Sequence, residues 1–82
     1  MHFVYVLKSI EFKWVYIGTT ADLQARLKRH NSGQVKSTKF YKPFLLAHTE
    51  TYNSKNEASK RELELKHNSF KKKELLILLG LV

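Results

Sequence analysis

Apolar and polar positions alternate near the start of the chain. Over residues 2–8, Phe3, Tyr5 and Leu7 fall on one face and the intervening residues on the other, which predicts a first strand. A second aromatic and β-branched run covers residues 14–18 after a short connection. Two such runs so close together predict an antiparallel hairpin.

The second run places Trp14, Tyr16 and Gly18 on one face. Because paired strands bring side chains on a common face into contact, we expect Tyr16 to lie near Tyr5. Gly18 is expected either to let the backbone turn sharply or to let another group approach closely. A Thr19-Thr20 turn that can cap a helix would follow.

A helical period follows this turn and ends near residues 31–33. At about 100° per residue, Arg26 and His30 fall within roughly 60° of Leu23, on the buried edge of this helix. Lys28 and Arg29 project away from it. Border cations are common because a long side chain can pack its stem and keep its charge in water, so a structural role and a functional role both remain open.

Residues 31–42 are polar and basic, with Phe40 and Tyr41 embedded, and are long enough to form a functional loop. Basic groups interleaved with aromatic ones suit a surface for phosphates and bases. The alternative is a solvated loop whose two aromatic residues anchor it to the core. Residues 44–51, after Pro43, run from apolar to polar and predict a third strand.

Ser54 and Glu57 match a capping box, which predicts the start of a second helix. Ala58, Glu62 and Leu65 share one face of that helix. A carboxylate on an apolar face must be paired, protonated or bound to a cation. An ion pair with a lysine or arginine is the commoner outcome, and metal binding is the alternative.

Residues 68–82 predict a cap, a basic turn and a short apolar helix that closes the core, with dimer or interfacial packing as the alternative. The 82 residues predict a single domain over 1–82. The chain has no cysteine, which excludes disulfides and thiolate metal sites. No apolar run reaches spanning length and no signal peptide is evident, so we expect a soluble cytoplasmic protein.

Fifteen lysines and arginines against seven acidic residues leave a net charge of +8. Such a field attracts polyanions and gives affinity that falls steeply with salt. Colloidal solubility and binding to an acidic membrane surface are alternatives. We expect a nucleic-acid partner, bound through its backbone, and no membrane partner.

An ordered set of motifs runs through the chain: Phe3-Val4-Tyr5, Tyr16-Ile17-Gly18, Arg26 with His30, and Glu62. In this set the chain resembles the GIY-YIG nucleases, in particular the small stand-alone (UPF0213-like) members similar to the N-terminal nuclease domain of the excinuclease C subunit. The family's first motif is Gly-Ile-Tyr, of which this chain keeps only the tyrosine, Tyr5. The second motif, Tyr-Ile-Gly, is unchanged at residues 16–18. Thr19 and Thr20 stand where some relatives carry a lysine. The asparagine that some relatives carry late in the chain has no clear counterpart near Glu74.

The resemblance implies an α+β fold, a three-stranded antiparallel sheet flanked by helices. It implies a metal-dependent endonuclease that hydrolyses DNA phosphodiesters with low sequence specificity, in DNA repair or recombination. Glu62 would hold one Mg²⁺ or Mn²⁺ ion and Arg26 would stabilise charge on the phosphate. Tyr5 or Tyr16 would deprotonate the attacking water, with Tyr5 favoured, and His30 is the other candidate for proton transfer.

The resemblance also suggests phosphate contacts. The residues expected to bind nucleic acid are Arg29, Lys36, Thr38 and Lys39. Specificity would come from substrate structure or from a protein partner, and the protein would be a monomer or weak dimer. A catalytically weak nucleic-acid-binding module is the main alternative, and an interaction protein that uses its apolar tail is a third.

Overall fold

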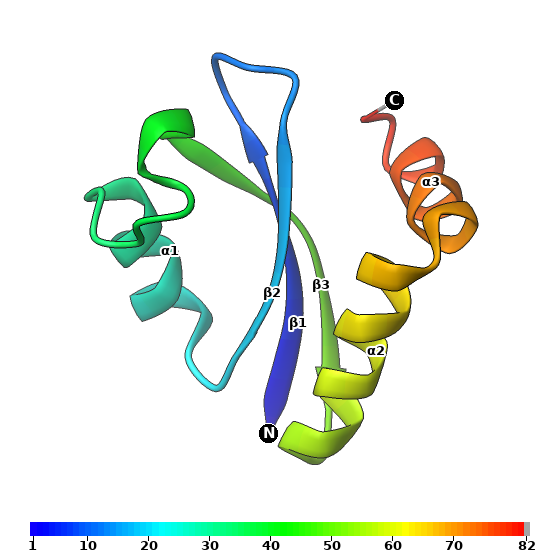
Figure 1. Cartoon of the computed structure of the whole chain (residues 1–82). Coiled ribbons are helices and arrows are strands. Elements are labelled where there is room, and N and C mark those ends of the chain that lie inside the picture. The colour runs from blue at the N-terminus through cyan, green and yellow to red at the C-terminus, as the bar shows by residue number, and fades with distance from the viewer. Residues whose placement is uncertain (82) are drawn as a thin grey trace.

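The computed structural model describes residues 1–81 and contains a three-stranded antiparallel sheet with helices on both of its faces (Figure 1). This arrangement confirms the fold class expected from the sequence. The elements in chain order are β1 (His2–Ser9), β2 (Val15–Thr20), α1 (Leu23–Asn31), the short 3-10 helix η1 (Lys39–Tyr41), β3 (Phe44–Tyr52), α2 (Lys55–His67) and α3 (Ser69–Leu78).

The central strand β1 is buried on both faces, because the strand order is β2-β1-β3 and each face carries a helical layer. Tyr5 and Leu7 face α1, and Val4 and Val6 face α2 and α3. All four side chains are buried, with exposed fractions of 0–3%. Figure 1 shows α1 on one side of the sheet and the other two helices on the opposite side. Each fully buried apolar side chain of this size contributes roughly 1.5–3 kcal/mol.

The turn between β2 and α1 differs from the expected one. β2 continues through Gly18, and Thr19 and Thr20 pair with β1 instead of forming a capping turn. Asp22 caps the helix, because its carboxylate accepts a hydrogen bond of 3.1 Å from the Ala25 backbone N–H. Thr20 accepts a bond from the Asp22 backbone N–H at 3.1 Å and so fixes the turn before the helix. The prediction of a Thr-Thr cap was therefore wrong by two residues.

The second helix begins where the sequence indicated. The Ser54 hydroxyl accepts a hydrogen bond of 3.2 Å from the Glu57 N–H. The return bond of a full capping box does not form within residues 1–81. Ala58 and Leu65 are fully buried on the face predicted for them. The phase of α2 is thus confirmed, which fixes where Glu62 lies.

The last helix closes the core on one face only. Asn68 caps it, and Leu75 and Leu76 are buried against the sheet layer, as expected. Phe70 and Leu78, on the outer side, are 73% and 78% exposed. Within residues 1–81, no helix is both long enough and apolar enough to cross a membrane.

Candidate active site

A buried chain of hydrogen bonds runs through His30, at the end of α1. Its Nε2 lies 3.0 Å from the Tyr5 hydroxyl, and its Nδ1 lies 2.8 Å from the Thr38 hydroxyl. Thr38 in turn donates to the Val35 carbonyl at 3.4 Å. Because the Thr38 hydroxyl donates its proton to Val35, it can only accept from His30. Nδ1–H of His30 therefore donates to Thr38, and Nε2 accepts from the Tyr5 hydroxyl. The imidazole is therefore oriented with its lone pair toward the tyrosine.

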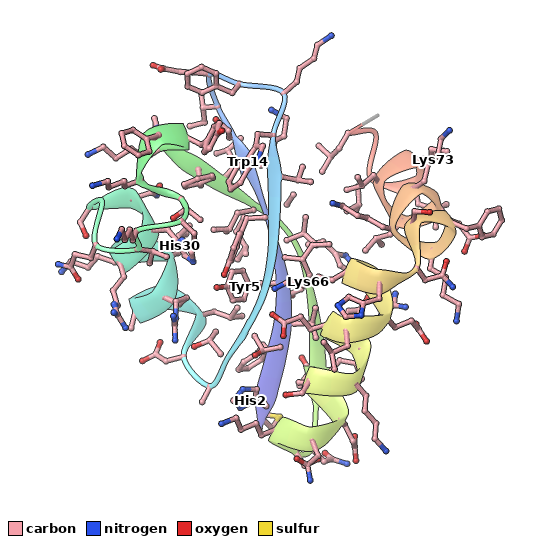
Figure 2. All side chains as sticks on the ribbon, in the orientation of Figure 1. His2, Tyr5, Trp14, His30, Lys66 and Lys73 are labelled. Atoms are coloured by element: carbon pink, nitrogen blue, oxygen red, sulfur yellow. The ribbon has the colours of Figure 1, made fainter. Side chains whose placement is uncertain are left out.

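Burial and nearby positive charges favour the neutral form of His30. Burial lowers the pKa of His30, and the positive charges of Arg26 and Arg29 lower it further. A neutral imidazole is the form that can accept a proton. Figure 2 shows His30 and Tyr5 on the α1 side of the sheet.

Tyr5 is a buried phenol, with only 3% of its surface exposed. Burial raises its pKa, the neighbouring Tyr16 raises it further, and Arg26 only partly offsets these effects. The positive charge of Arg26 is thus present, but burial outweighs its effect on the pKa of Tyr5. Tyr5 therefore keeps its proton at neutral pH.

Gly18 pairs with Tyr5 across the β1–β2 ladder and leaves room for its ring. A Cβ atom at this position would lie 2.5 Å from the Tyr5 hydroxyl oxygen, 2.7 Å from its Cζ and 3.0 Å from Cε2 of Tyr16. Of the two roles expected for this glycine, close approach is confirmed. The sharp turn is wrong, because Gly18 lies inside the strand.

Tyr16 is the more accessible of the two tyrosines. It is half-buried, its ring centroid lies 6.2 Å from that of Tyr5 and 5.1 Å from that of His30, and its hydroxyl makes no hydrogen bond within residues 1–81. The expected proximity of the two tyrosines is confirmed. Tyr16 thus offers a phenol to solvent beside the buried Tyr5–His30 pair.

Glu62 reaches the same edge of the sheet from the opposite helical layer. Its carboxylate lies 3.2 Å from the Lys66 ammonium, one helical turn along α2, and that ammonium lies 5.6 Å from the centre of the Tyr16 ring. Figure 2 shows Lys66 extending from α2 toward the sheet. The expected ion pair forms, and it brings Glu62 close to Tyr16.

The donor set fits a hard ion that keeps most of its water. Residues 1–81 contain no group of three or more histidine, cysteine or acidic side chains that could hold a metal. Glu62 would therefore be a single carboxylate ligand, and its side chain is 20% exposed. Mg²⁺ commonly binds through one or two carboxylates, with water and substrate phosphate completing its shell. Lys66 would have to release the carboxylate.

The residues expected to meet nucleic acid separate into two groups. Arg29, Lys36 and Lys39 are exposed on α1 and the segment that follows it. Thr38 is fully buried and its hydroxyl is bonded to His30, so direct phosphate contact by Thr38 is wrong for this conformation. Arg26 is half-buried, and its positive charge lowers the pKa of both Tyr5 and His30, so it acts on both groups through its electrostatic field.

Sequence patterns missed two partners in this site. Thr38 was expected to contact phosphate; it lies eight residues after His30, outside any helical or strand period, so no spacing indicated that it is the partner of His30. Lys66 lies four residues after Glu62, a spacing that brings side chains together on a helix and that could have identified it.

A separate ionic network joins β3 to α2. The Glu50 carboxylate accepts hydrogen bonds from Arg61 at 2.8 and 3.1 Å, from Tyr52 at 2.7 Å and pairs with His48 at 2.9 Å. Burial alone would raise the pKa of Glu50, but the bonds from Arg61, Tyr52 and His48 lower it to about 2. This network ties the sheet to the helix that carries Glu62.

Comparison with known proteins gives consistent matches. The family model of the GIY-YIG catalytic domain matches residues 1–74. UPF0213 protein BH0048 of Halalkalibacterium halodurans is 43% identical over 77 residues, covering 93% of this chain and 81% of that protein. UPF0213 protein SAV0488 of Staphylococcus aureus is 43% identical over 77 residues, covering 93% of each. The solution NMR structure of BH0048, from Bacillus halodurans, is 42% identical, has a TM-score of 0.57 and covers 95% of this chain and 83% of that one.

Proposed function

Because this chain belongs to the GIY-YIG family, which is a nuclease superfamily, we propose that it is a metal-dependent endonuclease acting on DNA with low sequence specificity. One observation carries the proposal: five side chains from both helical layers lie within contact or electrostatic range of one another at the β1–β2 edge of the sheet. These are Tyr5, Tyr16, Arg26, His30 and Glu62. We infer a role in DNA repair or recombination, with specificity that comes from substrate structure or from a protein partner.

The accessibility of the tyrosines supports a division of roles. Tyr16 is half-buried and its hydroxyl has no hydrogen-bond partner among residues 1–81, whereas Tyr5 is almost fully buried and bonded to His30. We therefore assign the contact with the attacking water to Tyr16, although the sequence had favoured Tyr5. Tyr5 holds His30 beside it and limits the movement of the Tyr16 ring.

His30 is the group best suited to take up a proton. Its Nε2 lone pair faces the phenol of Tyr5, and burial together with Arg26 favours the neutral form at pH 7. Thr38 fixes the tautomer from the other side of the ring. Such orientation is part of general acid–base catalysis, which contributes roughly 10²–10⁴-fold to a rate.

Arg26 and Glu62 would bind the charged groups of the reaction, the phosphate and the metal ion. Arg26 presents a guanidinium beside Tyr5 and His30, where it can pair with a phosphate oxygen. Glu62 would hold a single Mg²⁺ or Mn²⁺ ion in place of its bond to Lys66. When bound, such an ion supplies positive charge and Lewis acidity at the phosphate.

Nicking of supercoiled plasmid tests the proposal. The protein is assayed with Mg²⁺, with Mn²⁺ and with chelator, beside Glu62→Ala and the control Glu74→Ala, which removes an exposed carboxylate from α3. We expect metal-dependent nicking that is lost with Glu62→Ala and kept with Glu74→Ala. Equal nicking by all three proteins would exclude Glu62 as the metal ligand.

The Glu62–Lys66 pair favours a second candidate function. A carboxylate already satisfied by a lysine needs no metal, and a net charge of +8 supports binding by itself. The second candidate is a nucleic-acid-binding module that keeps the nuclease fold. Salt-sensitive DNA binding without nicking in any metal would favour it.

A further inference from the structure

The 3-10 helix η1 is held rigidly at both ends. Before it, the Thr38 hydroxyl bonds to His30. At its end, the Tyr41 ring stacks on Trp14 with centroids 4.1 Å apart and planes 12° apart, and the Tyr41 carbonyl accepts a hydrogen bond of 2.7 Å from the Ser9 hydroxyl. The turn between these anchors therefore has a fixed orientation relative to the site.

This turn presents an aromatic ring to solvent. Phe40 is 74% exposed, while Tyr41, the next residue, is half-buried against Trp14. The structure thus separates the two aromatic residues of the segment into an anchor and a free ring. The Lys39 ammonium lies 5.1 Å from the centre of the Phe40 ring, so the ring carries a positive charge beside it.

The charge of α1 and of the segment that carries Phe40 favours an anionic partner that also has flat apolar groups. Arg29, Lys36, Lys39 and Lys42 are all exposed on α1 and on the segment that ends at β3. Nucleic acid combines phosphates with aromatic faces, and base stacking on a protein ring is a common source of affinity for single strands. A base inside an intact duplex is already stacked on its neighbours, so only an unpaired base can use the ring.

We propose that Phe40 is a stacking platform for an unpaired base and that it directs the protein to DNA with a single-stranded or unpaired segment beside the cleaved strand. The proposal deepens the nuclease function proposed above and rests on it for the cleavage step. Lys39 and Lys36 would hold the flanking phosphates. The hydrogen bond between His30 and Thr38, which lies two residues before Phe40, ties the segment that carries this platform to the site.

A fluorescence experiment with chelator tests stacking without cleavage. The probe is a short single strand with one 2-aminopurine, whose emission falls when the base stacks. We compare the unaltered protein with Phe40→Leu, Phe40→Trp and the matched control Phe70→Leu, which changes a 73% exposed phenylalanine on the opposite layer. Phe40→Leu should abolish quenching and weaken binding roughly 5- to 150-fold. Phe40→Trp and Phe70→Leu should keep both.

A cleavage assay separates the two proposals. With metal, a substrate carrying an unpaired flap should be cut faster than a fully paired duplex of the same sequence, and Phe40→Leu should lose only this preference. Equal affinity and quenching for Phe40→Leu and the unaltered protein would overturn the stacking role, as would the absence of binding to any strand. Quenching without cleavage would reject the nuclease proposal and leave the platform standing.

Discussion

Replacing Gly18 by alanine tests the packing on which the candidate site depends. Gly18 has no positive φ and lies within β2, so its backbone conformation suits any residue. At such a position Gly→Ala normally stabilises a protein by about 0.4–1 kcal/mol, because it restricts the unfolded chain. The structure predicts the opposite sign here.

The reason is a clash that Tyr5 cannot avoid easily. The added Cβ would lie 2.5 Å from the Tyr5 hydroxyl oxygen and 2.7 Å from Cζ, and the ring is buried and bonded to His30 at 3.0 Å. Overpacking costs about 1–3 kcal/mol, and a strained hydrogen bond adds about 1 kcal/mol. After the backbone gain, the net loss is about 1–3 kcal/mol, which lowers the Tm by roughly 5–20 °C for a domain of this size.

Thermal and urea denaturation followed by circular dichroism measure this loss. Tyr5→Phe removes the nearer atom of the clash and the bond to His30, so the ring can shift. In that background Gly18→Ala should cost less by about 1 kcal/mol, the coupling typical of residues in contact. If Gly18→Ala is as stable as the unaltered protein, the packing argument fails.

The hydrogen-bond networks around Glu50 and His30 predict the effects of two further substitutions. Because the pKa of Glu50 is held at about 2, against roughly 4.3 when unfolded, the folded state binds fewer protons between these values, so stability falls as pH drops from about 5 to 2. Glu50→Gln should lower the free energy of unfolding by about 1–3 kcal/mol at pH 7. In urea titrations at several pH values, the stability of this variant should fall less between about pH 5 and pH 2 than that of the unaltered protein. An equal fall in both proteins would exclude Glu50 as the cause of the acid sensitivity. Thr38→Val should lower the nicking rate at least ~10-fold, because the His30 tautomer loses its anchor, and Thr38→Ser should restore it. The His30 ring nitrogen shifts in NMR spectra report the tautomer directly, and an unchanged tautomer with an unchanged rate would contradict the assignment.

Regular patterns predicted the elements well for physical reasons. Strand alternation placed Tyr5 and Tyr16 on one face, and helical phase placed His30 and Glu62 on buried edges, as the structure shows. Both signals come from the fixed periods of strands and helices, which tertiary packing seldom overrides over a full element.

Contacts outside these periods could not be predicted in this way. The cap of α1 is Asp22 and not the threonines that the sequence indicated, because Thr20 pairs with β1. The Thr20 hydroxyl instead fixes the turn by accepting a hydrogen bond from the Asp22 N–H. The burial of Thr38 depends on a segment that folds back on His30, and no local spacing encodes that return. The pKa of Tyr5 depends on how deeply its ring is covered, which only the packed structure determines.

The pairing of β1 with β2 has a consequence for how the candidate site is assembled during folding. Tyr5 lies opposite Gly18, and its chain neighbours Val4 and Val6 lie in the core on the other face of the sheet. A slip of one residue in this ladder would exchange the two faces of β1, so that Tyr5 would point toward α2 and α3 and the two valines toward α1. The strand register therefore links the core to the candidate site, because Tyr5 and Tyr16 are aligned only when the core has formed in this register. Hydrogen-exchange protection of β1 and the recovery of the proposed nicking activity should then appear together on refolding.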